Sequence, residues 1–466
     1  MYKRQPVLSG LVLFAIFLFF VTRGLDQGYR AAAAFLPFGA AAVFIVGGLS
    51  ILVFSASFLI LLGLWGLQSM SVRNAGIRFE FTSLLVVALC IYAVLITMIG
   101  PRLFMGEIMV FSMDRNVVGY RLRWDVFSGL SPLVPSTGNI SQLAYFLVTF
   151  AVFLMSLSLA RKTGPELIHK ALVGAAIVNI ILAVIDIAGG GALLSIVQTA
   201  TYSYQTDIQL LGVQRVTGGF PEASSFGGFT AVLAGYFIRL WFSTRKTLTG
   251  VLGAGNLILG LLSLSSTFIL VAVGLTLILC AQFAVYLARG NGVSARSKPF
   301  VLFFALSGSA VAFAMVATPA GTIALDFLDY LIFSKTDSVS GFERGKWAIR
   351  GLEIGAESYG LGIGLGSTRS NGILSVWISN FGLIGTLLFL WIYKNILFAR
   401  ASAFANPEYK KYFNAAAVGL SAMIIGGLTT ATTPDPGLHF ALLAALSVAS
   451  RRPVVVVYSS KQPRLA

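Results

Sequence analysis

Charged residues are scarce in this chain of 466 residues. Asp, Glu, Lys and Arg together make up 11% of it, whereas hydrophobic types make up 57%. An average soluble domain carries about 25% charged residues. So few charges cannot cover the surface of a soluble protein of this size, and so apolar a chain is neither disordered nor fibrous. The composition therefore predicts a polytopic membrane protein.

Residues that usually ligate metals or form crosslinks are also few. Two cysteines, Cys90 and Cys280, lie inside apolar runs, and the two histidines, His169 and His439, are far apart. This excludes a disulfide framework and a cysteine-ligated metal site, and it disfavours a histidine-rich centre. The chain has no Walker motif, which argues against an ATP-driven transporter. We expect neither a metal nor a cofactor.

Apolar runs long enough to cross about 30 Å of hydrocarbon recur along the whole chain. We expect an all-α transmembrane bundle of about 12–13 spans, forming a single integral membrane domain (1–466). The expected spans are 6–22, 31–48, 51–69, 82–99, 140–159, 171–189, 226–243, 248–263, 267–288, 299–318, 373–393, 412–430 and 437–450. The weakest part is the uncharged stretch 31–69, which is barely long enough for two spans. A cytoplasmic N-terminus would require one span fewer there.

The positive net charge of +16 comes from 33 Lys and Arg against 17 Asp and Glu. If the Arg451-Arg452 tail is cytoplasmic, most basic residues fall in short cytoplasmic loops, as the positive-inside rule requires. No nucleic-acid partner is needed to explain the charge. Three extracytoplasmic loops are long, at 100–139, 190–225 and 319–372. Because long loops often carry function, chemistry is expected on that side.

Arg215 is the only basic residue of loop 190–225, and Gly218, Gly219 and Pro221 follow it at the mouth of the next predicted helix. A helix N-terminus offers free N–H groups and a partial positive charge, and arginine adds a planar fork of donors. This combination suits a phosphate group. The alternative is an arginine that reaches the lipid headgroups along the interface.

Loop 319–372 mixes basic and acidic residues. Residues 322–334 have the pattern of an amphipathic surface helix, and 343–357 that of a second helix. In the second helix, Arg344, Trp347 and Gly351 share one face. The loop offers the charged residues Glu343, Arg344, Lys346, Arg350, Glu353, Glu357 and Arg369. This mixture suits a site that holds a pyrophosphate and also needs carboxylates, and the alternative is a solvated surface whose charges pair with one another.

Several uncharged features also stand out. The stretch 360–367 alternates glycine with aliphatic residues but is no dinucleotide fingerprint, so it forms either a backbone nest for an anion or a close-packed turn. Asn256 and Asn380, inside predicted spans, are expected to bond across helices. Asp186 either faces the interior or reaches the interface. His439 follows Pro434-Asp435-Pro436, where capping and catalysis are both open.

The order of these features resembles the superfamily of O-antigen ligases and Wzy-type polymerases, over about residues 140–430. Members are bacterial inner-membrane glycosyltransferases of the GT-C type. The segment Arg215-x-x-Gly-Gly-Phe-Pro-Glu is similar to the family's arginine, glycine and proline before a span. Arg344 and Gly355 resemble the arginine–glycine spacing of the polymerases' large periplasmic loop. Asn371-Gly372, followed by Gly382 and Gly385, resembles a motif that begins with histidine in many members.

Two positions depart from that pattern. Asn371 stands where ligase members carry the histidine proposed as catalytic base, which favours the polymerase branch. The segment Ser265-Ser266-Thr267-Phe268 stands where many members carry an arginine.

The resemblance implies metal-independent transfer of lipid-linked repeat units on the periplasmic face of the bacterial inner membrane. The donor would be an oligosaccharide on undecaprenyl pyrophosphate or a similar polyprenyl carrier, and the product an O-antigen, capsule or exopolysaccharide. Arg215 and Arg344 would stabilise the pyrophosphate leaving group. The general base would be Glu222 or Glu343. Further substrate-binding residues would be Arg369, Arg350, Asn371 and Lys346. Membrane lipids, a chain-length regulator and a flippase are the implied partners.

Two alternative functions remain open. The first is an O-antigen ligase that transfers finished polymer to the lipid A core. The second is a transporter, either a flippase of lipid-linked oligosaccharides or an ion-coupled permease. Transporters tend to show internal repeats, broken helices and ionisable residues at mid-membrane. The sequence shows no convincing repeat between its halves and almost no mid-membrane charge, which favours the enzyme.

Overall fold

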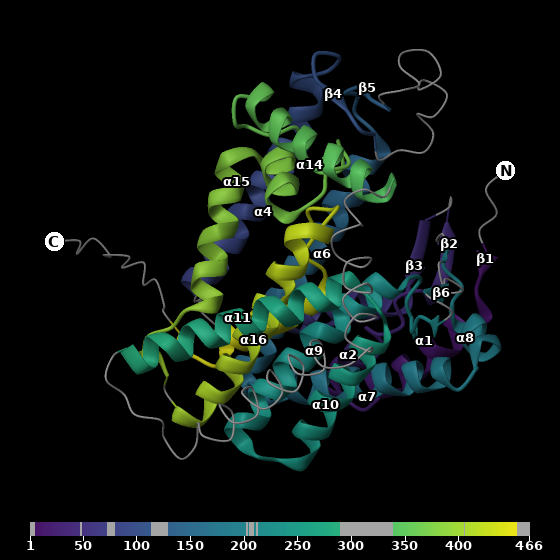
Figure 1. Ribbon diagram of the computed structural model, residues 1–466, viewed down its shortest axis with the longest axis vertical. Helices are drawn as coiled ribbons and strands as arrows, with labels where there is room; N and C mark the ends of the chain where they lie inside the picture. Colours follow the sequence, from purple (N-terminus) through teal and green to yellow (C-terminus); the bar gives the residue numbers. More distant parts are fainter. Residues whose placement is uncertain are drawn as a thin grey trace, which may run out of the picture.

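The computed structural model describes residues 5–46, 49–71, 80–112, 129–201, 204, 209–210, 213–288, 339–404 and 406–453. This part of the chain is mostly helical, with a few short strands (Figure 1). Six of its helices are long and apolar enough to cross a membrane, which confirms the prediction of a helical membrane protein at that level. They are α4 (Phe81–Leu103), α6 (Thr137–Thr163), α7 (Glu166–Ile187), α9 (Ala223–Thr244), α15 (Ile373–Leu397) and α16 (Lys410–Thr430), the last preceded by the 3-10 turn η4 (Pro407–Tyr409).

Five further apolar helices are α1 (Leu8–Thr22), α3 (Val53–Ser71), α10 (Thr247–Leu262), α11 (Ser266–Ala288) and α17 (Leu438–Ala449). Together with the six long helices they occupy the predicted spans to within a few residues, except for two spans. The first, 299–318, lies outside the described residues, as does the expected surface helix 322–334. The second, 31–48, is wrong.

Residues 31–48 include a strand in place of a membrane helix. The short helix α2 (Leu25–Ala34) stops before Pro37 and Gly39, which disfavour a continuing helix. Then β2 (Ala42–Val46) pairs antiparallel with β3 (Leu49–Leu52) and β1 (Gln5–Pro6). Its apolar and β-branched residues suit a strand, and its start packs against Gly10 of α1. One span is therefore lost before residue 70, as a cytoplasmic N-terminus requires.

One end of the bundle, which we call the basic end, gathers residues that the positive-inside rule assigns to the cytoplasm. Arg161, in the last turn of α6, forms an ion pair of 2.6 Å with Glu80 at the start of α4. Its guanidinium also donates to the carbonyl groups of Val448, Ala449 and Arg451, where α17 ends. Helices α4, α6 and α17 therefore share this end.

The other end carries the loops that the sequence places outside. Figure 1 shows α14 (Val339–Glu357) and the strand pair β4 (Met109–Val110) and β5 (Ser131–Pro132) there, beyond the ends of α4 and α15. The helix predicted at 343–357 is confirmed and begins at Val339. Two smaller units lie elsewhere in the described chain, α8 (Gly191–Val197) and the pair β6 (Gln209–Leu210) and β7 (Val213–Gln214). The turn η3 (Ala401–Ala403) follows α15.

The glycine-rich segment 358–368, which we call the glycine hook, is packed between helices. Gly360, Gly362, Gly364 and Gly366 all have positive φ, between 73° and 85°. Side chains disfavour this backbone region. Every backbone N–H from Gly360 to Gly366 donates to a protein acceptor. None of these seven N–H groups is left for an anion, which favours the close-packed turn over the nest.

Helix α15 is interrupted where the hook meets it. Gly382 has φ 64° and ψ −161°, which is not helical. The hook's Ile363 and Gly364 donate backbone hydrogen bonds to the carbonyls of Ser379 and Asn380, and Leu383 donates to Gly360. Irregular backbone at membrane depth is tolerated when protein groups satisfy it, as they do here. The Asn380 side chain also accepts from Gly366, so it bonds to the hook and not to another helix as predicted, whereas Asn256 of α10 does bond across helices, to Asn179 of α7.

Candidate functional site

The segment that leads from Arg215 to α9 is held by Asp186, at the end of α7. One carboxylate oxygen of Asp186 accepts from the Thr217 N–H (2.7 Å), the Thr217 hydroxyl (3.2 Å) and the Gly218 N–H (2.9 Å). The Arg215 Nε donates to the carbonyl of Ser263, just past α10, over 3.2 Å. Arg215 is therefore anchored to protein, and Asp186 acts as the brace of its segment.

Arg215 lies beside the beginnings of two helices. Gly227, in the first turns of α9, packs against Ser263 and Ser265, directly before α11. Both helix N-termini add partial positive charge to that of the guanidinium. The Ser265 hydroxyl is buried and has no hydrogen-bond partner among the described residues. The carboxylate of Glu222 is already hydrogen-bonded, because it accepts from the hydroxyl groups of Ser224 (2.5 Å) and Ser225 (3.1 Å).

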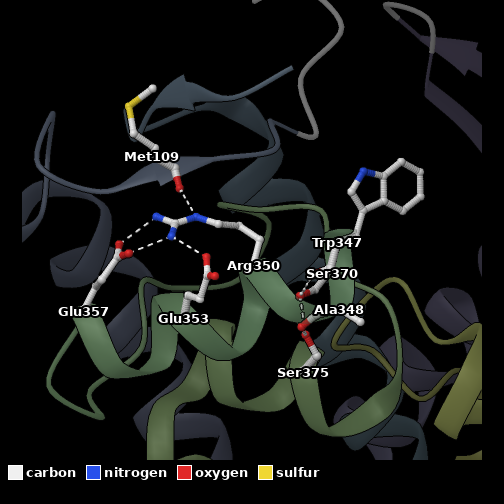
Figure 2. Close-up of polar contacts among 8 residues, drawn as sticks. All are labelled: Met109, Trp347, Ala348, Arg350, Glu353, Glu357, Ser370 and Ser375. Atoms are coloured by element: carbon white, nitrogen blue, oxygen red, sulfur yellow. Dashed lines mark hydrogen bonds and ion pairs between the residues drawn. The ribbon is translucent and has the colours of Figure 1, made fainter. Parts of the chain in front are cut away.

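On α14, Arg350 is fully engaged by protein groups (Figure 2). Its guanidinium pairs with Glu357 (2.6 and 2.7 Å) and Glu353 (2.8 Å), and its Nε donates to the Met109 carbonyl. Burial lowers the pKa of Arg350, but the hydrogen bonds and charges of the two glutamates outweigh it and leave this pKa above its usual value. Arg350 thus fastens α14 to β4.

The first turns of α14 carry charges with fewer contacts. Arg344 is half-buried and forms no hydrogen bond or ion pair with the described residues. Glu343 and Lys346 are exposed, and the Lys346 ammonium lies 4.5 Å from the centre of the Phe342 ring. Further along, Gly351 packs so closely on Ser370 and Ser375 of the next segment that a methyl group would overlap them. Arg344 therefore extends from a firmly packed helix.

Arg369 and Asn371 border α14 and α16. The Arg369 guanidinium lies 5.1 Å from the centre of the Trp347 ring, a cation–π arrangement. The Asn371 amide donates to the Thr429 carbonyl at the end of α16 (3.0 Å), and its oxygen is buried without a partner among the described residues. Asn371 therefore joins the start of α15 to the end of α16.

Contacts at the end of α16 connect the segment of Arg215 with the segment that carries Arg369 and Asn371. Gly426 of α16 packs against Thr267 in the first turn of α11, and Thr267 also lies against Gly228 of α9. The segments of Arg215 and Asn371 thus meet through α16 and α11. Arg350 is turned toward Met109 and does not belong to this group.

A further pair of ionisable residues lies between these segments. Asp435 belongs to residues 431–437, which we call the α16–α17 turn, and His439 lies at the start of α17. The His439 ring lies 5.8 Å from that of Phe229 on α9, and Phe229 is in turn 5.3 Å from Phe220. Only the Pro434-Asp435-Pro436 sequence pointed to this turn. Its contact with the middle of α6 could not be read from the sequence.

No model of a known protein family matches the sequence, and no curated protein matches it either. The chemistry of the described residues has to carry the functional argument.

Proposed function

We propose that this chain is a GT-C-like polymerase of the bacterial inner membrane, which joins polyprenyl-pyrophosphate-linked oligosaccharide repeat units on the periplasmic face. The observation that carries the proposal is the arrangement of Arg215. It lies at the end of a membrane helix bundle, beside the N-termini of α9 and α11, on a segment fixed by Asp186. Such a group of fixed positive charges suits a lipid-linked pyrophosphate.

The arginines would act on the leaving group. When the bond between the donor sugar and the pyrophosphate breaks, negative charge grows on the phosphate oxygens. A donor that already points there lowers the barrier, and the loss of one such donor costs about 3 kcal/mol. Arg215 would hold one phosphate, and Arg344 would approach from α14, together with Lys346 on the same helix and Arg369, which lies against Trp347. Arg350 contributes indirectly, because it fixes α14 against β4.

A transporter of lipid-linked oligosaccharides is the second candidate, because one observation favours it. Helix α15 is broken at Gly382, with the glycine hook inserted beside it. Discontinuous helices of this kind are common in transporters. Every hook N–H from Gly360 to Gly366 is already bonded to protein, however, so these groups are not available to a substrate.

Arg344→Ala tests the proposal in a deletion strain that carries the gene on a plasmid. Loss of the arginine is expected to reduce long polymer at least about 100-fold, because one leaving-group donor of about 3 kcal/mol is removed. The protein itself should reach the membrane in normal amount, since Arg344 has no partner among the described residues. A polysaccharide gel and a membrane immunoblot measure the two quantities.

The matched control is Arg102→Ala. Arg102 is an exposed arginine at the outer end of α4 and donates to the Met98 carbonyl of its own helix. Its loss should leave polymer length unchanged, because it lies on neither of the arginine-bearing segments. Normal polymer in Arg344→Ala would contradict the role given to Arg344.

The deletion strain itself separates the candidate functions. Single repeat units that accumulate there would support a polymerase, and long polymer detached from the lipid A core would support a ligase. Unchanged polysaccharide, with flipping of a labelled donor in proteoliposomes, would support the transporter.

A further inference from the structure

The α16–α17 turn reaches the middle of the helix bundle. Helix α17 has 12 residues and is therefore about 18 Å long. It ends at Arg161 in the last turn of α6. Asp435 lies just before α17 and beside Thr149 of α6, because the rings of Phe440 on α17 and Phe150 on α6 are 6.0 Å apart. Thr149 precedes Arg161 by a little over three turns of α6, again about 18 Å. Both measures put Asp435 near the midpoint of α6, which has 27 residues.

The Asp435 carboxyl group has hydrogen-bond donors but no cation beside it among the described residues. One of its oxygens accepts from the N–H of Gly437 (3.0 Å). Tyr145 of α6 lies close enough for an electrostatic interaction with the Asp435 carboxylate. The His439 ring folds back over Gly437. Asp435 and His439 are both only half-buried. A carboxyl group at this depth in a membrane protein is costly and is usually kept for function.

A row of hydroxyl groups on α6 leads from the outer end to Asp435. Thr137, Ser141, Tyr145 and Thr149 follow at intervals of four, so they share one face of the helix. Thr137 and Tyr145 are exposed, Ser141 between them is half-buried, and Thr149, the innermost of the four, is 1% exposed. Hydroxyl groups both donate and accept hydrogen bonds, as sugar hydroxyls and water do. We call this row the hydroxyl stripe.

We propose that Asp435 is the general base of the transfer reaction, and that the hydroxyl stripe of α6 guides the acceptor sugar to it. The inference rests on the proposed function. The acceptor hydroxyl oxygen forms a bond to C1 of the donor sugar, and its proton passes to the Asp435 carboxylate. The bond between C1 and the phosphate oxygen breaks, and its electron pair leaves with the pyrophosphate.

The two glutamates expected for this role are less suitable in the structure. The Glu222 carboxylate already accepts two serine hydroxyls of its own helix turn, and Glu343 is exposed on α14. Asp435 instead lies just before α17, which packs on the middle of α6 through Phe440 and Phe150, at the inner end of the hydroxyl stripe. This position gives Asp435 both the depth and the polar approach that a base for a sugar hydroxyl needs.

Asp435→Asn tests the inference in the full-length protein, reconstituted in lipid vesicles with a labelled polyprenyl-pyrophosphate oligosaccharide. Asparagine keeps an oxygen that can accept from Gly437, so the turn is preserved while the base is lost. We expect kcat for polymer formation to fall at least about 100-fold, as for loss of a general base, with KM for the donor within about twofold. Asp435→Glu should restore part of the rate. Polymer formation within about twofold of wild type would overturn the assignment.

Failure of this inference and failure of the proposed function give different results. If wild type forms no polymer, the proposed function fails and takes the inference with it. If wild type polymerises, Arg344→Ala does not, and Asp435→Asn does, only the role of Asp435 fails. Should Asp435→Asn not reach the membrane, Thr149→Val carries the test, because it keeps shape and removes one stripe hydroxyl. A fall in kcat of about tenfold supports the inference, and an unchanged kcat overturns it.

Discussion

The glycine hook and the α16–α17 turn are both irregular segments inserted among membrane helices, yet they are built differently. In the hook, every N–H from Gly360 to Gly366 has a protein acceptor, and Ile363 and Leu365 are fully buried. The turn carries Thr432, Thr433 and Asp435, which are exposed or half-buried. Protein acceptors and close packing satisfy the polar groups of the hook, whereas the turn carries polar side chains that are partly exposed.

This difference suggests that the hook supports the fold and the turn supports the reaction, which mutations in each segment can test. Changes in the hook should lower stability, because they disturb satisfied backbone and tight packing. Changes in the turn should lower activity and leave the fold intact. Thermal unfolding of the purified protein in detergent measures the first effect, and polymer formation in vesicles measures the second.

The largest loss of stability is expected for Gly362→Ala. Gly362 has φ 83°, and a methyl group there would overlap the Gly382 backbone. Left-handed backbone costs about 1–2 kcal/mol for alanine, and overpacking adds about 1–3 kcal/mol. We therefore expect about 3 kcal/mol of destabilisation or a chain that does not accumulate. The control is Gly345→Ala on α14, an exposed site with nothing within 4 Å. Equal stability of the two variants would refute the close-packed hook.

A smaller loss is expected for Asn380→Leu, which keeps the shape of the side chain. The substitution leaves the buried N–H of Gly366 without its acceptor, which costs about 1–3 kcal/mol. Asn395→Leu is the matched control, because the Asn395 amide bonds only to Trp391 of its own helix among the described residues. If both variants melt at the same temperature, the bridge from Asn380 to the hook does not support the fold.

The smallest change in stability is expected for Asp435→Asn. The turn keeps its hydrogen bond from Gly437. The free energy of unfolding should therefore shift by no more than about 0.5 kcal/mol. The same variant is expected to lose polymer formation. A loss of stability as large as that of Asn380→Leu would mean that Asp435 braces the fold, and the contrast between the hook and the turn would disappear.

The sequence predicts the helices well because each apolar run must satisfy its own backbone in lipid. Spans such as 140–159 and 373–393 therefore recur as α6 and α15. The run 31–48 is as apolar as the others, but Pro37 and Gly39 interrupt it, and β2 finds its partners in β1 and β3. Hydropathy alone does not record such pairing between segments.

The site was harder to predict than the helices, because its contacts join distant parts of the chain. The sequence suggests a leaving-group role for Arg344 and substrate binding for Arg350, and only the structure shows that Arg350 pairs with Glu353 and Glu357. The sequence also draws attention to the Pro-Asp-Pro turn. It does not predict how deep in the bundle the turn lies, because that depends on the packing of α17 along α6. The charges can be read from the sequence, but their partners require the fold.

The shortness of α17 has a consequence for biogenesis. A helix of about 18 Å cannot cross about 30 Å of hydrocarbon. The insertion machinery therefore has no ordinary span to recognise at 438–449. The carbonyl end of this helix docks on Arg161, a residue made almost three hundred positions earlier. We therefore expect α17 to join the bundle by docking on α6, which is synthesised earlier, and not by its own hydrophobic length.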